Sequence, residues 1–232
     1  MSTNHVALII GNSDGIGLAL TRRLLHLGWT VAGISRRENN IDHPNYSHAV
    51  ADVLSEEFTN VLSHHAQTPP NICVYCAGIG EELDFDNLAF ERQVFGVNLT
   101  GAVRTIEIVL PALLRAQSGH VLMLSSTADV LVSPEAPSYC ASKVALSSYV
   151  EGLALAMRGT GVAMTNVRFG FVDTKMAKGD RKPLMMTAER AVDHLMRCID
   201  KRPVRYTRPR TMGLLAGLAQ PMAKLQLALH RQ

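Results

Sequence analysis

The pattern of apolar and polar positions along the chain predicts strands and helices in regular alternation. Continuous apolar runs, typical of strands buried on both faces, occur at Val6–Ile10, Thr30–Ile34, Ser47–Ala51, Ile72–Ala77, His120–Leu124 and Val162–Arg168. Apolar residues recur with helical spacing at Ile16–Leu27, Glu56–His65, Phe90–Phe95, Gly101–Arg115, Tyr139–Arg158 and Ala188–Lys201. This alternation predicts a single α/β domain, a doubly wound Rossmann-type parallel sheet with helices on both faces.

Two segments fall outside this pattern. Asp173–Pro183 is polar, and we expect it to be mobile. The second segment is a basic run, Arg202–Arg210, followed by the apolar stretch Met212–Leu229. We predict that residues 1–201 form the nucleotide-binding and catalytic part, and that residues 202–232 are a helical extension of the same domain. The extension is expected to cover the substrate cleft or pack on another subunit; contact with an anionic membrane is the weaker alternative.

Composition narrows the class of protein only modestly. The chain has 232 residues, 47% hydrophobic and 19% charged, which is enough to bury a core without disulfides or metals. A net charge of +3 does not by itself indicate nucleic-acid binding. The N-terminus lacks the features of a signal peptide, and no apolar run reaches the length of a membrane span, so a cytoplasmic location is expected.

The four cysteines suggest a structural role. Cys73 and Cys76 have the spacing of a redox or metal pair, but they lie in a predicted strand. Residues three apart in a strand point to opposite faces, so the two thiols are not expected to meet. The nine histidines show no helical metal spacing, and we expect no metal site.

A glycine-rich turn follows the first predicted strand, with the sequence Gly-Asn-Ser-Asp-Gly-Ile-Gly over residues 11–17. Glycines make such a turn tight and let its N–H groups approach a pyrophosphate, while the following helix presents its positive end. Ser13 and Asp14 could bond the turn or the ligand. The strand, turn and helix in succession predict a nucleotide site.

A second constellation carries acid–base chemistry. Tyr139 and Lys143 are four residues apart and share one face of a predicted helix. The lysine charge is expected to lower the pKa of the phenol, so that it can exchange a proton with an alcohol or carbonyl. Ser126 lies thirteen residues upstream of Tyr139 and could hydrogen-bond the same substrate oxygen.

These motifs together resemble the classical short-chain dehydrogenase/reductase family. The glycine turn matches Thr-Gly-x-x-x-Gly-x-Gly with Ile10 at the threonine, and Tyr139 and Lys143 match Tyr-x-x-x-Lys. The family's Asn-Asn-Ala-Gly turn is present as Tyr75–Gly78 with both asparagines replaced, and its Pro-Gly segment as Phe169–Thr174 without the proline. The resemblance extends from about Val6 to about Lys201.

The resemblance implies a role for further residues. Asn98 matches an asparagine that positions a water in a proton relay, Asp52 an adenine contact, and Val172 and Thr174 contacts to the nicotinamide amide. Lys143 is implied to hold the nicotinamide ribose. The cofactor-binding residues expected from the turn and the resemblance are Gly11, Asn12, Ser13, Asp14, Gly15, Ile16, Gly17, Ser35, Arg36, Arg37, Asp52, Val53, Ala77, Gly78, Asn98, Tyr139, Lys143, Gly170, Val172 and Thr174.

The end of the second strand bears on cofactor choice. Ser35 stands where the family's NAD-dependent members place Asp, and Arg36 could pair with a 2′-phosphate. Glu38 is the counterargument, because a carboxylate at a similar position suits the ribose of NAD; it lies beyond the strand end and is expected to face solvent. NADP(H) is therefore favoured over NAD(H).

The sequence thus predicts an oxidoreductase that transfers hydride between NADP(H) and a small carbonyl or alcohol, with Asn98, Ser126, Tyr139 and Lys143 as its catalytic set. An NADP(H)-binding regulator or scaffold with little turnover is the alternative. Substrate contacts are expected from Ile79–Leu88, Asp129–Ser138 and Lys175–Met186, with Leu131, Val132, Met176 and Met185 suggesting an apolar pocket. Members of the family commonly form dimer or tetramer contacts through the helices that correspond to Gly101–Arg115 and Tyr139–Arg158. The resemblance therefore implies a homo-oligomer.

Overall fold

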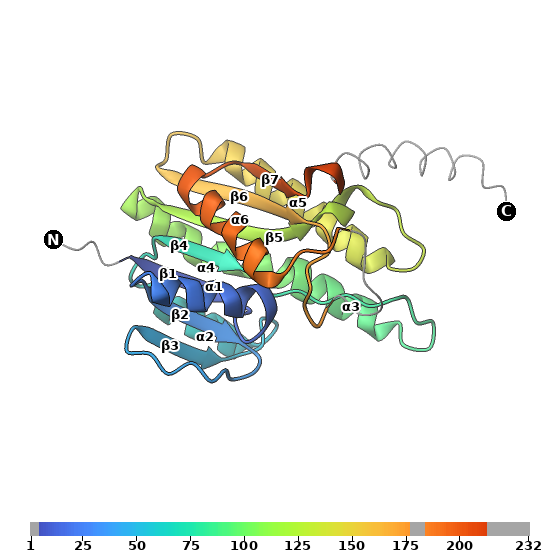
Figure 1. The fold of residues 1–232 in the computed structure, drawn as a ribbon, viewed down its shortest axis with the longest axis horizontal. Helices are drawn as coiled ribbons and strands as arrows, with labels where there is room; N and C mark the ends of the chain where they lie inside the picture. Colours follow the sequence, from blue (N-terminus) through green and yellow to red (C-terminus); the bar gives the residue numbers. More distant parts are fainter. Residues whose placement is uncertain (1–4, 177–183, 213–232) are drawn as a thin grey trace.

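The fold is a single parallel sheet covered by helices on both faces (Figure 1). The computed structural model describes residues 5–176 and 184–212. Its seven strands are arranged in the order β3-β2-β1-β4-β5-β6-β7, and every neighbouring pair is parallel. They are β1 (Val6–Ile10), β2 (Thr30–Ser35), β3 (Tyr46–Val50), β4 (Ile72–Tyr75), β5 (Gly119–Ser126), β6 (Val162–Phe169) and β7 (Arg205–Arg208). The predicted doubly wound fold is confirmed.

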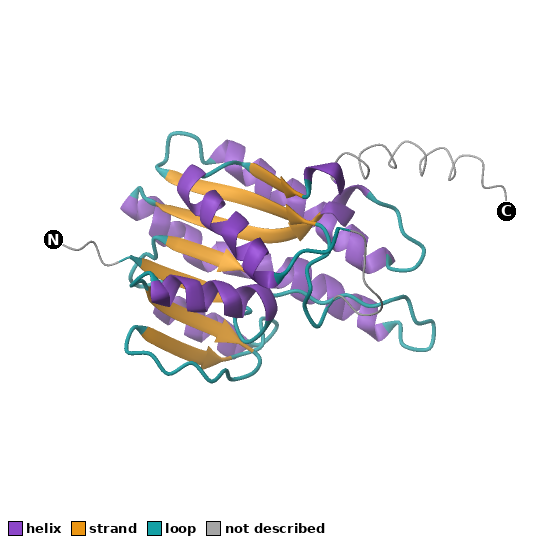
Figure 2. Cartoon of the chain, viewed as in Figure 1, coloured by secondary structure: helices purple, strands orange, loops and turns teal. Residues whose placement is uncertain are grey.

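Alternate residues of the inner strands enter two separate cores. On one face, α1 (Gly15–His26) and α6 (Ala188–Lys201) cover a core that includes Ile9. On the other face, α2 (Glu56–His65), α4 (Gly101–Ala116) and α5 (Pro137–Ala156) cover a core that includes Leu8 (Figure 2). Because both of their faces are buried, the inner strands are largely apolar, as the sequence indicated.

The seventh strand was not predicted. The chain beyond Lys201 was expected to form a helical extension, yet Arg205–Arg208 pairs with Asn166–Phe169 at the edge of the sheet. Its sequence, Arg-Tyr-Thr-Arg, has no apolar run because the strand lies at an edge and remains partly exposed. The expected apolar helix Met212–Leu229 lies outside the described residues apart from Met212, and the polar segment Asp173–Pro183 is described only as far as Met176.

One helical stretch is longer and more apolar than the sequence suggested. The short helix α3 (Ala89–Phe95), a π-helical turn η1 (Gly96–Thr100) and α4 continue into one another. Within the described residues, this 28-residue stretch alone is long and apolar enough to cross a membrane, with mean hydropathy 1.4, but half of the apolar window is buried in the protein. Its apolar residues are accounted for as those of a core helix.

The two cysteines of the apparent pair do point to opposite faces. Cys73 lies fully buried in the core beneath α2 and α4, whereas Cys76 packs against the core beneath α1. Both thiols are free, and burial raises the pKa of each to about 12. These thiols are therefore structural core groups, as predicted.

Candidate functional site

A cavity of roughly 710 Å³ opens at the carboxyl ends of the strands. The turns that follow β1, β2, β4 and β6 form its walls, together with the N-terminal half of α5. Ligands of open α/β sheets bind at this edge. The predicted nucleotide turn and the predicted acid–base pair therefore face the same space.

The glycine turn brings backbone segments closer than any side chain would permit. Gly11 has φ +85°, and a Cβ there would lie 2.5 Å from the Ala77 nitrogen. A Cβ on Gly17 would lie 2.2 Å from the Gly11 carbonyl oxygen. Helix α1 begins at Gly15, so its free N–H groups open toward the cavity. The result is a shallow backbone cradle with the positive end of a helix behind it, which suits a pyrophosphate.

Asp14 bridges the two sides of the cavity mouth. Its carboxylate accepts a hydrogen bond from the Gly15 N–H at 2.8 Å and caps the helix. The same carboxylate lies 2.7 Å from the ammonium of Lys175 and 3.6 Å from the guanidinium of Arg37. The hydrogen bond from Lys175 is the main reason that the pKa of Asp14 lies below its usual range. Lys175 was expected only in a substrate segment, but it also reaches the cofactor end of the cavity.

The end of β2 presents two cations to the cavity. Arg36 and Arg37 are exposed and line its wall, whereas Glu38 is exposed and lies outside it. The Ser35 side chain is buried, and its hydroxyl donates to the Arg37 carbonyl at 2.8 Å. Ser35 therefore shapes the loop that carries the arginines.

Two predicted cofactor residues direct their side chains elsewhere. Asn12 is fully buried, and its amide donates to the Tyr46 hydroxyl at 2.7 Å, in space that a Cβ on Gly33 would fill. The Asp52 carboxylate accepts from the Leu54 N–H at 2.9 Å, closing a local turn. Neither residue lines the cavity. The structure thus gives both side chains a local partner.

The predicted acid–base pair lines the same cavity. Tyr139 and Lys143 line the wall one turn apart on α5, and Ser126 lies at the end of β5 near the phenol. Burial raises the pKa of Tyr139, and the nearby Ser126 hydroxyl opposes this shift. The pKa of the phenol therefore lies above its usual value and not below it as expected, because burial outweighs the effects that lower it.

The position of the lysine explains this difference. The Lys143 ammonium lies 5.7 Å from the centre of the Tyr139 ring and donates to the Leu124 carbonyl at 3.0 Å. It is 4% exposed, and burial lowers its pKa to about 8. Lys143 therefore remains mostly protonated at neutral pH, and its ammonium is anchored to the strand.

Asn98 is a buried tie between three segments. It lies in the π-helical turn η1, and its amide both accepts from the Ile79 N–H and donates to the Ile79 carbonyl, each at 2.9 Å. It also donates to the Ser142 hydroxyl on α5 at 3.0 Å. Asn98 does not line the cavity, so its observed partners fix the segment after β4 against the helix that bears Tyr139. π-helical turns are frequent at functional sites.

The substrate end has fewer of the predicted residues. Met176 lines the cavity, whereas Leu131 and Val132 do not, and Met185 lines a separate hollow. The three segments expected to contact substrate do reach the cavity, through Ile79, Gly80, Glu81, Glu82, Ala136 and Lys175. The lining residues that were not singled out from the sequence are Val97, Leu124, Ser125 and Phe171. Of the predicted set, those lining the cavity are Gly11, Ser13, Asp14, Gly15, Ile16, Gly17, Ser35, Arg36, Arg37, Val53, Ala77, Gly78, Tyr139, Lys143, Gly170, Val172 and Thr174.

Comparison with known proteins supports this arrangement. An uncharacterised oxidoreductase of Staphylococcus saprophyticus is 28% identical over 190 residues, covering 75% of this chain and 81% of its own. A short-chain dehydrogenase of Burkholderia cenocepacia, solved in complex with NADP, superimposes with a TM-score of 0.84 at 21% identity, covering 99% of this chain and 98% of its own.

A third protein shows the same fold with the other cofactor. A 4-hydroxyisoleucine dehydrogenase complexed with NADH has a TM-score of 0.79 at 18% identity, covering 88% of this chain and 96% of its own. The family profile described as short chain dehydrogenase matches residues 5–184. With its parallel sheet, glycine cradle and Tyr139–Lys143 helix, the chain belongs to the short-chain dehydrogenase family of oxidoreductases.

Proposed function

We propose that this protein is an NADP(H)-dependent oxidoreductase that acts on a small carbonyl or secondary alcohol, with Tyr139 as its acid and base. One observation carries the proposal: Tyr139 lines the same cavity as the glycine cradle, with Lys143 one helical turn away and Ser126 nearby. A proton donor and an anion cradle in one space are what such a reaction requires.

The residues present fit a dinucleotide. Gly11 and Gly17 leave room for close backbone approach, and the start of α1 favours an anion there. Ala77, Val172 and Thr174 continue the wall toward Tyr139. When bound, a nicotinamide cofactor would supply or accept the hydride at the substrate carbon.

The chain's own groups would control the proton. Because burial raises its pKa, Tyr139 retains its proton near neutral pH and can donate it to a substrate carbonyl oxygen. The Ser126 hydroxyl can hydrogen-bond the same oxygen where negative charge develops. The Lys143 ammonium then stabilises the phenolate that remains, as a nearby positive charge does.

The two cations after β2 support a preference for NADP(H). Arg36 and Arg37 are exposed at the cavity wall, and a 2′-phosphate placed there would gain charge-assisted hydrogen bonds. The Asp14 carboxylate opposes this, but Lys175 and Arg37 offset its charge. Similar folds have been solved with NADP and with NADH, so the preference is argued from these side chains.

Loss of NADPH absorbance with a panel of aldehydes and ketones tests the proposal. Turnover by the parent, its loss in Tyr139→Phe, and similar NADPH affinity for both proteins are the expected results. Tight NADPH binding without turnover across a broad panel would favour the regulator instead. Turnover by Tyr139→Phe at the parental rate would refute the assigned role of the phenol.

A further inference from the structure

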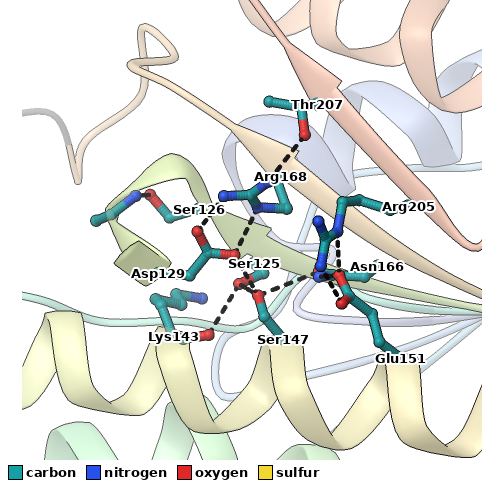
Figure 3. A network of polar contacts seen from close by, with 11 residues as sticks. Ser125, Ser126, Asp129, Lys143, Ser147, Glu151, Asn166, Arg168, Arg205 and Thr207 are labelled. Atoms are coloured by element: carbon teal, nitrogen blue, oxygen red, sulfur yellow. Dashed lines mark hydrogen bonds and ion pairs between the residues drawn. The ribbon is translucent and has the colours of Figure 1, made fainter. Parts of the chain in front are cut away.

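We propose that the buried ion pair between Asp129 and Arg168 positions the acid–base groups of the proposed site. The inference rests on the proposed function, since it concerns residues that support Ser126 and Lys143 without lining the cavity themselves. Figure 3 shows the pair at the centre of a chain of polar contacts that joins β5, β6, β7 and α5.

The pair itself is enclosed. Asp129 lies in the 3-10 turn η2 (Thr127–Val130), and Arg168 lies near the end of β6. Both carboxylate oxygens of Asp129 accept from the guanidinium, one of them from Nε at 2.5 Å. The side chains of Asp129 and Arg168 are 4% and 9% exposed. A third contact, from the guanidinium to the Thr207 hydroxyl at 3.2 Å, reaches β7.

The turn that carries Asp129 begins at Ser126. The Ser126 hydroxyl accepts from the Ala128 N–H at 3.1 Å, so the direction of this side chain depends on the geometry of the turn. Anchoring Asp129 to β6 fixes the far end of that turn. The ion pair therefore sets where the Ser126 hydroxyl meets the phenol.

The same carboxylate also holds the helix that carries the phenol and the lysine. Ser147, one turn after Lys143 on α5, donates to Asp129 at 2.6 Å. Because the Ser147 hydroxyl donates its proton to Asp129, it accepts a hydrogen bond from the Ser125 hydroxyl at 2.7 Å. Ser125 also lies 3.3 Å from the Lys143 carbonyl. Asp129 thus ties the serine turn, the sheet and the helix together at one point.

The effect of the ion pair on catalysis can be tested separately from its effect on protein stability. Desolvation makes a buried ion pair a weak net contributor, and apolar side chains of similar volume often replace both partners without loss of stability. Removing one partner instead leaves an unpaired buried charge, which is strongly destabilising. A double replacement can therefore remove the directional contacts while the protein stays folded.

A second arginine pair on the same helix provides a matched control. Glu151 on α5 pairs with Arg205 on β7 and accepts from Asn166 at 2.7 Å. The Arg205 side chain is 58% exposed, and Glu151 is one contact removed from Ser147, through Asn166, whose amide oxygen lies 3.4 Å from the Ser147 hydroxyl. Glu151→Gln alters an ion pair near the site without touching the serine turn.

The experiment compares Asp129→Leu/Arg168→Met, Asp129→Asn and Glu151→Gln with the parent in the full chain. Folding is checked by circular dichroism and thermal melting. In both Asp129 variants we expect kcat with the best substrate of the panel to fall, on the order of 10²-fold in the double variant, because small misplacements of catalytic groups cost this much. NADPH affinity should stay within about twofold, since the glycine cradle is separate. Glu151→Gln should retain the parental kcat.

A measurement that needs no turnover can test the positioning role of the ion pair independently of the proposed function. The ring signals of Tyr139 in NMR, assigned by their loss in Tyr139→Phe, report the environment set by Ser126. They should shift in Asp129→Asn and remain unchanged in Glu151→Gln. A folded double variant with parental kcat, or a Tyr139 signal that does not move in Asp129→Asn, would overturn the positioning role. A parent without turnover would instead count against the proposed function.

Discussion

The backbone of Gly80 lies directly against the ring of Tyr139. A Cβ built on Gly80 would be 2.6 Å from Cδ2 of the tyrosine, closer than real side-chain contacts allow. Gly80 follows Ile79, whose N–H and carbonyl are both held by Asn98. The segment after β4 is thus fixed at one end by the asparagine and covers the proposed proton donor at the other.

Replacing Gly80 with alanine should displace the Tyr139 ring. We expect kcat for carbonyl reduction to fall about tenfold or more, because the phenol leaves its position beside Ser126. NADPH affinity, measured by calorimetry, should change little. The control is Gly152→Ala on the same helix as Tyr139, where an added Cβ meets nothing within 4 Å. That variant should retain the parental kcat and gain about 0.5–1 kcal/mol of stability.

The buried Lys143 predicts a pH-dependent stability. Its folded pKa is about 8 against an ordinary value of 10.5, so between these values the unfolded chain binds a proton that the folded chain has released. The lysine's contribution to the free energy of unfolding therefore rises with pH across this window and is lost as pH falls through about 8.

Urea unfolding of the parent and of Lys143→Met, without cofactor, measures this contribution. The stability of the parent relative to the variant should increase from about pH 8 to pH 10.5. Lys201→Met removes an exposed lysine at the end of α6. Its difference from the parent in unfolding free energy should change little with pH. A flat difference for Lys143→Met as well would contradict the burial of its charge.

The cations after β2 predict the cofactor preference. Arg36→Ala should weaken NADPH binding about tenfold, with little effect on NADH, because only NADPH carries the 2′-phosphate that the guanidinium would bind. Ser35→Asp should shift the preference toward NADH, since a carboxylate binds the ribose hydroxyls and repels the 2′-phosphate. The ratio of kcat/KM for the two cofactors measures both effects. Arg22→Ala, an exposed arginine on α1 outside the cavity wall, is the control.

Tyr75 has a role that its position in the motif did not suggest. It replaces an asparagine of the family pattern, and its buried hydroxyl donates to the Val97 carbonyl at 2.6 Å, in the π-helical turn next to Asn98. Tyr75→Phe would leave that carbonyl unsatisfied and should cost about 1–3 kcal/mol of unfolding free energy. Denaturant unfolding measures the loss. Tyr149→Phe, at a partly buried tyrosine on α5, should cost less.

The sequence indicated the parts of the site that depend on local patterns. The glycine cradle and the Tyr139–Lys143 pair are recognisable because turn geometry and helical spacing are encoded within a few residues. The side-chain direction of Asn12 is set instead by Gly33 and Tyr46 on neighbouring strands. Periodicity contains no information about such contacts.

Other features were missed because they lie between segments that are distant in the chain. Asp129 and Arg168 are 39 residues apart, and each alone resembles an ordinary surface charge. Strand β7 has no apolar run because it lies at the edge. The lysine effect on the Tyr139 pKa was predicted from proximity, but burial of the phenol outweighs it. Desolvation depends on the whole surrounding structure.

The strand order also bears on the order in which parts of the site can form during synthesis. From β4 onward, each new strand is added beside the one made just before it, in the order β4, β5, β6 and β7. The elements that hold the nucleotide cradle, β1 and α1, leave the ribosome first, and Ser126, Tyr139 and Lys143 follow. Arg168 emerges before its partner Thr207 on β7. A nascent chain that has not yet reached β7 therefore contains every proposed catalytic group. It still lacks Thr207, which contacts Arg168 of the Asp129–Arg168 ion pair.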